Sequence, residues 1–264
     1  MKYVEFAGLP GAGKTTLVKE LLKRNKDYHS LEEIYENSIK IAFNEHKDSF
    51  SCKRYFPAKL SFSLYNLGIF PDSYLPIMSE LINLKGKMTF KYEKKYPNSF
   101  QTFDKYVREY TDDKNRILTV LNWLQILSEK YIAIETYDTL QEGLILVDEG
   151  FLQRTFSIFT PPFPTKEISE KEVKEYLGKI FLPDTLVLTD ASSEICEQRM
   201  LKRKEGYPGK YKSLDKKQML NRIDEMKKVS RIIKETFESQ GVEVIELSTG
   251  RKVEESIKEI SRRI

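Results

Sequence analysis

The eight residues from Gly8 to Thr15 constrain this chain more than any other part of its sequence. They read Gly-Leu-Pro-Gly-Ala-Gly-Lys-Thr and directly follow a short apolar run at residues 3–7. This is a full match to the phosphate-loop pattern GxxxxGK[ST], which joins a strand to a helix. Its glycines allow a tight turn in which several amide N–H groups converge on phosphate oxygens. An accidental glycine-rich turn is the alternative, but the full match at such a junction argues against it.

Three polar side chains at the end of the loop, Lys14, Thr15 and Thr16, have expected contacts with a bound triphosphate or its metal ion. We expect the Lys14 ammonium to bridge the β- and γ-phosphates and the Thr15 hydroxyl to bind Mg²⁺, which prefers oxygen ligands. Thr16 is expected to contact the α-phosphate, and the following helix adds the positive end of its dipole. The expected cofactors are therefore ATP and Mg²⁺. The expected cofactor-binding residues of the loop are Gly8, Pro10, Gly11, Ala12, Gly13, Lys14, Thr15 and Thr16.

Four short apolar runs predict the strands of a mostly parallel sheet. Each is followed by a helical pattern, and this alternation indicates a three-layer α/β/α phosphate-loop fold with helices on both faces of the sheet. Ser169 and Glu172 have capping-box spacing, and Gly241 marks a helix end. The predicted strands are 3–7, 144–147, 185–189 and 242–247, and the predicted helices are 14–24, 151–159, 171–180, 194–204, 214–240 and 252–263.

The length of 264 residues suits a single phosphate-loop domain, 1–264, that carries an insertion. More than a hundred residues separate the first two predicted strands, and most of them have a helical pattern. We therefore expect a large helical insertion at about 31–140 that serves as an acceptor-binding or lid module. Its part at 51–103 has poor periodicity and predicts no clear element.

The composition excludes several classes of protein. The 44 Lys and Arg residues exceed the 40 Asp and Glu residues by only four, which is too few for a nucleic-acid coat protein. Two cysteines provide neither a disulfide framework nor a zinc cluster. Without a signal peptide or an apolar run of about 18 residues, we expect a cytoplasmic protein with no membrane anchor. Nucleic acid is not an expected partner, and a homodimer is compatible with the sequence.

Two carboxylates, Asp148 and Glu149, directly follow the predicted strand 144–147. Ligands of open α/β sheets bind at the carboxyl ends of the strands, so these acids should face the phosphate loop. We expect Asp148 to bind Mg²⁺ together with Thr15, and Glu149 to take a proton from the acceptor. Their alternative role is to complement a helix dipole. Arg154, on the following helix, faces either the site or the solvent.

A basic segment runs from Arg199 to Lys217, with eight basic and two acidic residues. Arg199 and Arg203 are four residues apart, which places them on one face of the predicted helix 194–204. The loop that follows contains Gly206 and Gly209. We expect a lid that brings the two arginines onto the transferring phosphoryl group, whereas most of the lysines are explained by a solvated helix face.

Taken together, these features resemble the nucleoside and nucleotide kinases, thymidylate kinases in particular. The likeness rests on the phosphate loop, on Asp148, on the segment 182–188 that leads to Glu194 and Arg199, and on the terminal strand, loop and helix. It implies that the lid arginines contact phosphates. It also implies that the loop 248–251, with Thr249, packs on the adenine. The likeness covers the two ends of the chain but not its middle.

The chain departs from the thymidylate kinases where the acceptor should be recognised. It has no Arg-Glu-Pro-Gly segment after a second strand, and Asp148-Glu149 stands where that family has Asp-Arg. Glu32 or Glu33 would end a weak second strand, although an amphipathic helix explains them equally well. The acceptor therefore stays open.

The expected activity is transfer of the γ-phosphate of ATP to a small-molecule acceptor, with a nucleoside or nucleotide favoured. The sequence has neither an NKxD segment, which reads guanine, nor an LSGGQ-like signature of transporter ATPases. One alternative is a kinase for a sugar or another metabolite hydroxyl, and another is a phosphate-loop ATPase or regulator that acts on a protein partner. Lysine and aromatic residues interleaved at 85–110 suggest a polynucleotide 5′-hydroxyl kinase as a further alternative.

Overall fold

The computed structural model describes residues 2–46, 84–137, 143–204, 206–248 and 252–264. The chain divides into two compact units. The first, the sheet unit, consists of Met1–Ser30, Asn98–Leu124 and Glu142–Ile264. The second, the helical unit, consists of Leu31–Pro97 and Gln125–Gln141.

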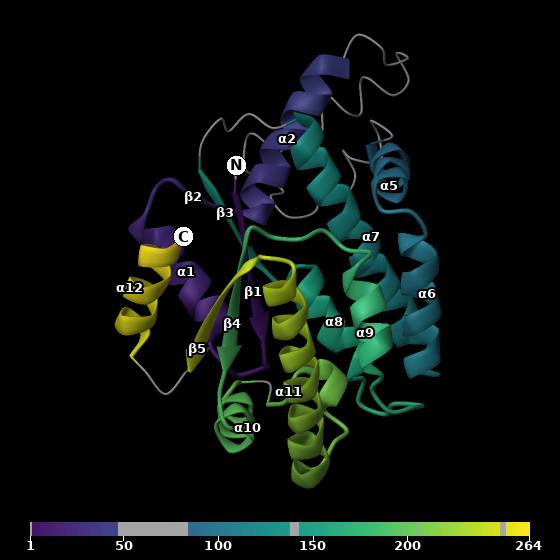
Figure 1. Cartoon of the computed structure of the whole chain (residues 1–264), viewed down its shortest axis with the longest axis vertical. Helices are drawn as coiled ribbons and strands as arrows, with labels where there is room; N and C mark the ends of the chain where they lie inside the picture. The colour runs from purple at the N-terminus through teal and green to yellow at the C-terminus, as the bar shows by residue number, and fades with distance from the viewer. Residues whose placement is uncertain (1, 47–83, 138–142, 205, 249–251) are drawn as a thin grey trace. The chain divides into compact units, whose positions relative to one another are not determined.

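The sheet unit is built on five parallel strands in the order β2-β3-β1-β4-β5 (Figure 1). The strands are β1 (Lys2–Gly8), β2 (Tyr28–Ser30), β3 (Leu144–Asp148), β4 (Thr185–Asp190) and β5 (Glu243–Ser248). The four predicted strands are confirmed, and β2, in the region of the weak second strand, is a short edge strand that ends at Ser30 rather than at Glu32 or Glu33. Because β1 and β3 are neighbours with Phe6 opposite Asp148, the loop after β1 and the acids after β3 leave the sheet side by side.

Helices cover both faces of this sheet, which confirms the three-layer α/β/α prediction. The helices wholly within the sheet unit are α1 (Lys14–Arg24), α6 (Ser99–Tyr110), α8 (Phe151–Phe159), α9 (Glu170–Leu177), α10 (Ser193–Leu201), α11 (Lys216–Ser239) and α12 (Val253–Arg263). α1 and α12 lie together on one side (Figure 1). α8 packs on β1 and α11 on β5.

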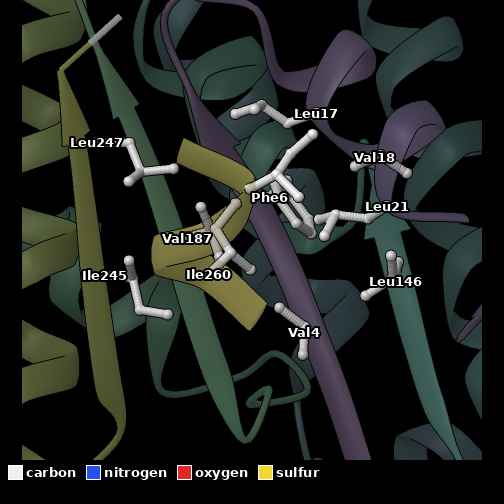
Figure 2. Packing of buried hydrophobic residues seen from close by; sticks show 11 residues of the cluster. Val4, Phe6, Leu17, Val18, Leu21, Leu146, Val187, Ile245, Leu247 and Ile260 are labelled. Atoms are coloured by element: carbon white, nitrogen blue, oxygen red, sulfur yellow. The ribbon is translucent and has the colours of Figure 1, made fainter. Parts of the chain in front are cut away.

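The alternation of side chains along the strands separates the two faces. Val4 and Phe6 of β1 join a buried cluster with α1 and α12 (Figure 2), whereas Glu5 accepts hydrogen bonds from α8. Full burial of a side chain such as Phe6 contributes about 1.5–3 kcal/mol. The face of β1 toward α8 therefore carries a buried carboxyl group, while the opposite face is apolar.

The helix that carries Arg199, α10 (Ser193–Leu201), is shorter than its sequence predicts. α10 ends at Leu201, so the predicted helix 194–204 is wrong at its end and Arg203 lies in the turn after the helix. Three consecutive cations and Gly206, whose φ is +70°, follow Leu201 and favour a turn over a helix. The Arg203 N–H donates to the Met200 carbonyl at 3.1 Å, as in a tight turn.

The helical unit contains α2 (Leu31–His46), α5 (Leu84–Lys95) and the later part of α7 (Lys114–Tyr137). Glu32 and Glu33 lie in the first turn of α2 rather than at a strand end, and Lys130 of α7 forms an ion pair with Glu32. Within the segment 51–103, for which no element was predicted, residues 51–83 lie outside the described part of the chain, and residues 84–103 contain α5 and the start of α6.

Most of the aromatic residues that are interleaved with lysines at 85–110 are buried. Tyr92 is buried in the helical unit, and Phe103, Tyr106 and Tyr110 are buried in the sheet unit. Side chains that pack in a core cannot stack on nucleic-acid bases. The observation that suggested a polynucleotide kinase is thus largely explained by packing. Among the described helices, none combines the length and the apolar character that crossing a membrane requires.

Candidate active site

The phosphate loop depends on glycine at three positions. Gly8, Gly11 and Gly13 have φ angles of +139°, +86° and +92°, which L residues rarely adopt. At Gly8 a Cβ would lie 2.2 Å from the Thr189 carbonyl oxygen of β4, and at Gly11 2.7 Å from the Cys196 carbonyl oxygen of α10. The loop is therefore strained for any other residue, and two of its glycines also permit close backbone packing.

Substituting these glycines should separate strain from steric overlap. Gly13→Ala places its Cβ in space that holds no described atom within 4 Å, so only the backbone strain of about 1–2 kcal/mol is expected. Gly8→Ala adds an overlap with a backbone oxygen, and we expect it to cost about 3 kcal/mol or more. Urea unfolding of both variants measures the difference. Equal losses of stability would contradict this account of Gly8.

Lys14 is buried at the start of α1, and its ammonium group forms hydrogen bonds with carbonyl oxygens of the loop. Its Nζ donates to the carbonyl oxygens of Gly8 at 2.9 Å and Leu9 at 3.0 Å. Burial lowers the pKa of Lys14 to about 8, against the opposing effects of Asp148 and Glu149. A buried ammonium with a lowered pKa gains stability when an anion binds beside it.

Asp148 ends β3 next to the phosphate loop and interacts with the Thr15 hydroxyl. Burial raises the pKa of Asp148, while Thr15 and Lys14 oppose the shift. Its Oδ1 is buried and finds no hydrogen-bond partner among the described residues. A carboxylate oxygen without a partner, beside a hydroxyl, fits a hard cation that prefers oxygen. In the described part of the chain, no three His, Cys, Asp or Glu residues form a metal-binding group, so phosphate and water would supply the other ligands.

Glu149 follows in a left-handed conformation, with a φ of +69°. Its carboxylate is largely exposed and accepts a hydrogen bond of 2.9 Å from Arg154 Nη2. The Arg154 guanidinium is mostly buried and lies 4.2 Å from the centre of the Trp123 ring. Arg154 thus faces the site rather than the solvent, which settles the two orientations that the sequence left open.

Lys14, Glu149 and Arg154 line one cavity of about 710 Å³ in the sheet unit, whereas Asp148 is not among its described lining residues. Its wall includes Lys14, Arg154, Arg199, Arg203 and Lys210, and Glu149 is the carboxylate among the described lining residues. A cavity of this size holds a small organic ligand. Its excess of positive charge favours an anionic one.

Most of the predicted site residues meet at this cavity. Arg199 Nη1 donates to the Gly11 carbonyl oxygen at 3.4 Å. Gly8 is absent from the wall, and its N–H donates to Gln153 Oε1 at 3.2 Å, so its place in the site is structural. Thr249 lies outside the described residues. The predicted residues in the wall are Pro10, Gly11, Ala12, Gly13, Lys14, Thr15, Thr16, Glu149, Arg154, Arg199 and Arg203.

Four residues of the site have no counterpart in the sequence predictions. Trp123, Gln153 and Lys210 line the cavity, and Arg116 donates to the carbonyl oxygen of Ser157 in its wall. Trp123 is the one tryptophan of the chain, which is a weak signal. The sequence favoured a solvated helix face for most lysines of the basic segment and did not single out Lys210. Lys210 lies in the cavity wall, and burial and the neighbouring cations Arg116 and Arg154 lower its pKa to about 7.

Glu5 of β1 does not line the cavity but holds the start of α8, which carries residues of the cavity wall. Its fully buried carboxyl group accepts the N–H of Leu152 at 2.7 Å and that of Gln153 at 3.4 Å, in the first turn of α8. A Cβ on Gly150 would lie 2.5 Å from this carboxyl group, so Gly150 allows the close approach. Burial raises the pKa of Glu5 to about 8. Glu5 thereby fixes the start of the helix that carries Gln153 and Arg154.

This buried acid should make stability depend on pH. The pKa of Glu5 rises on folding from 4.5 to about 8, so between these values the folded state binds the extra proton. Its contribution is complete below pH 4.5 and is lost as the pH rises toward 8, by about 1.4 kcal/mol per unit at the steepest. Glu5→Gln should flatten this slope. Urea unfolding at pH 5.5 and 8.5 measures it, with the exposed Glu254→Gln as control, and parallel profiles for Glu5→Gln and wild type would contradict the assignment.

Comparisons with known proteins complete the description. No family model matches this chain, and no curated protein matches it. Among solved structures, the chain is similar to a deoxyadenosine kinase from M. mycoides with the products dCMP and a flexible dCDP bound, at 11% identity over 99% of this chain and 97% of that chain, with a TM-score of 0.45. The same kinase with bound dATP gives 11% identity, coverage of 99% and 98%, and a TM-score of 0.41. The likeness to thymidylate kinases stays a prediction.

Proposed function

We propose that this protein is a kinase that transfers the γ-phosphate of ATP, with Mg²⁺, to a small-molecule acceptor. The observation that carries the proposal is the cavity wall, which joins the phosphate loop and its Lys14 to four further cationic side chains and to Glu149. A nucleoside or nucleotide is the favoured acceptor, as the resemblance of both ends of the sequence to nucleoside and nucleotide kinases suggests.

On the donor side, the loop amides and Lys14 hold the phosphates. Lys14 exchanges its contacts with the Gly8 and Leu9 carbonyl oxygens for phosphate oxygens, and the bound anion compensates its buried charge. Arg199 and Arg203 stabilise the charge on the transferring phosphoryl group. Thr15 and Asp148 would hold Mg²⁺, which would neutralise phosphate charge when bound.

On the acceptor side, an oxygen of the acceptor attacks the γ-phosphorus. The bond from that phosphorus to the β,γ-bridging oxygen breaks, and ADP leaves with the electron pair. Glu149 accepts the proton of the attacking O–H group, and its exposed carboxylate in the cavity wall supports this assignment. Until the proton arrives, Arg154 stabilises the negative charge of the Glu149 carboxylate.

We further propose that part of the predicted insertion 31–140 contributes to acceptor binding. Its residues 98–124 belong to the sheet unit. Trp123 from this stretch lines the cavity, and Arg154 packs on its ring. A flat ring in the wall offers an apolar surface to an acceptor with a planar base.

The test is transfer of labelled γ-phosphate from ATP to a panel of nucleosides, nucleoside monophosphates, sugars and other alcohols. A labelled acceptor product that requires Mg²⁺ supports the proposal. Release of inorganic phosphate without any labelled product indicates an ATPase or regulator and overturns it. Lys14→Met should lose the labelled product. Lys23→Met, an exposed change on the same helix, should keep it, which separates loss of the site from loss of folded protein.

A further inference from the structure

Three cationic side chains meet around Ser157 of α8, and none of them belongs to the phosphate loop. Lys210 Nζ donates to Ser157 Oγ at 3.3 Å, and Arg116 donates to the Ser157 carbonyl oxygen. Arg154 lies one helical turn earlier on α8, so it shares a face with Ser157. We call Arg116, Arg154, Ser157 and Lys210 the Ser157 cluster. Arg154, Ser157 and Lys210 line the cavity, and Arg116 lies behind Ser157.

The charge of this cluster is poorly compensated by the protein. Arg116 and Arg154 both lower the pKa of Lys210, and burial lowers the pKa of Arg116 itself. The Nε atoms of Arg116 and Arg154 are buried and have no hydrogen-bond partner among the described residues. Holding like charges and unpaired donors together is costly. The arrangement becomes favourable once an anion binds to it.

The cluster lies on the acceptor side of the proposed reaction. The donor phosphates have Lys14, the loop amides and Arg199, whose guanidinium donates to Gly11 within the loop itself. Arg154, by contrast, pairs with Glu149, and the charge of Lys210 interacts with Glu149 as well. An anion at the cluster would therefore lie beside the group proposed to receive the acceptor proton.

We propose that the acceptor carries a phosphate monoester, as a nucleoside monophosphate does, and that the Ser157 cluster binds this phosphate. The inference rests on the proposed function and names its substrate class. An oxygen of the acceptor phosphate attacks the γ-phosphorus, the bond from that phosphorus to the β,γ-bridging oxygen breaks, and ADP leaves with the electron pair. The monoanionic monoester gives its P–O–H proton to Glu149, whereas the dianion has none to give. The cluster reduces the repulsion between the two phosphate-bearing substrates as they approach. Neutral nucleosides and sugars would leave the cluster without a ligand.

Binding of inorganic phosphate tests the cluster apart from catalysis. The protein is first saturated with Mg²⁺ and the non-hydrolysable β,γ-imido analogue of ATP, which fills the γ-phosphate position, and inorganic phosphate is then titrated by calorimetry. We expect a further phosphate site that Lys210→Met weakens at least about tenfold. Lys210→Arg should restore part of the binding. Lys212→Met, an exposed change two residues away, should bind phosphate like wild type, and all variants should bind the analogue within about twofold.

Two results would overturn the inference. One is the absence of phosphate binding to the loaded protein. The other is an equal loss of analogue affinity in Lys210→Met, which would assign the cluster to the donor. The acceptor panel adds a second readout, in which monophosphates should exceed the matching nucleosides in kcat/KM by at least about tenfold. Equal transfer to both would refute the substrate class alone, whereas phosphate binding without transfer to any acceptor would refute the proposed kinase activity alone.

Discussion

Replacing Lys14 with methionine is expected to lower the rate of phosphoryl transfer by about a hundred- to thousandfold. Lys14 is the charge closest to the glycine turns of the loop, and methionine keeps the length of the side chain without its ammonium. The fold should persist because the loss of two hydrogen bonds to the Gly8 and Leu9 carbonyl oxygens is offset by removal of a buried charge. Single-turnover transfer and thermal unfolding measure the two effects.

The control for Lys14→Met is Lys23→Met on the same helix, where the side chain is exposed and pairs with Glu20. This variant should transfer phosphate at the wild-type rate. If Lys14→Met kept wild-type turnover while folded, the central role of the phosphate loop would be lost. If it failed to fold, Lys14→Arg, which keeps the charge but has a larger head group, would show whether charge or shape is required.

The second large effect is expected at the acids after β3. Asp148→Asn should weaken the dependence of ATP affinity on Mg²⁺, because the unpartnered Oδ1 beside Thr15 belongs to the proposed ion site. Glu149→Gln should leave ATP affinity within about twofold and lower the transfer step by about a hundredfold or more. ATP affinity with and without Mg²⁺, measured beside single-turnover rates, separates the two.

Exchange of these two effects would reverse the roles of Asp148 and Glu149. Wild-type transfer rates in both variants would show that the acids do not act in the reaction. Because Glu149 also pairs with Arg154, Arg154→Met is the matched control. It leaves the Glu149 carboxylate in place. Because Arg154 also belongs to the Ser157 cluster, the rate of this variant is measured at saturating acceptor, where it distinguishes loss of the proton acceptor from loss of the ion pair.

Local sequence patterns predicted the helices and strands well where regular apolar spacing marks an element. The helix after the phosphate loop and the helix after Asp148-Glu149-Gly150 begin and end as predicted, at Lys14–Arg24 and Phe151–Phe159. Both start after a glycine and carry clear apolar spacing. The sequence indicated β2 only as a weak second strand that would end at Glu32 or Glu33, because its three half-buried residues give no alternation. Its pairing with β3 depends on the tertiary fold.

The candidate site also contains residues that the sequence predicts and residues that it does not. The loop residues and the acids follow strands directly, so the sequence places them at the same edge of the sheet. Arg116 and Trp123 lie on α7, and Lys210 follows almost ninety residues later, so no local spacing connects the lysine with the other two. Glu5 looks like an ordinary strand residue between Val4 and Phe6. Only the packing of α8 on β1 shows that it is buried.

The left-handed backbone at Glu149 has an evolutionary consequence. A residue with a side chain costs about 1 kcal/mol or more in this conformation, and glycine would adopt it freely. Selection for heat resistance alone would therefore drive position 149 toward glycine, whereas selection for turnover would retain the carboxylate. A change to glycine here is expected to stabilise the fold and to remove the proposed proton acceptor, so stability and turnover favour different residues at position 149.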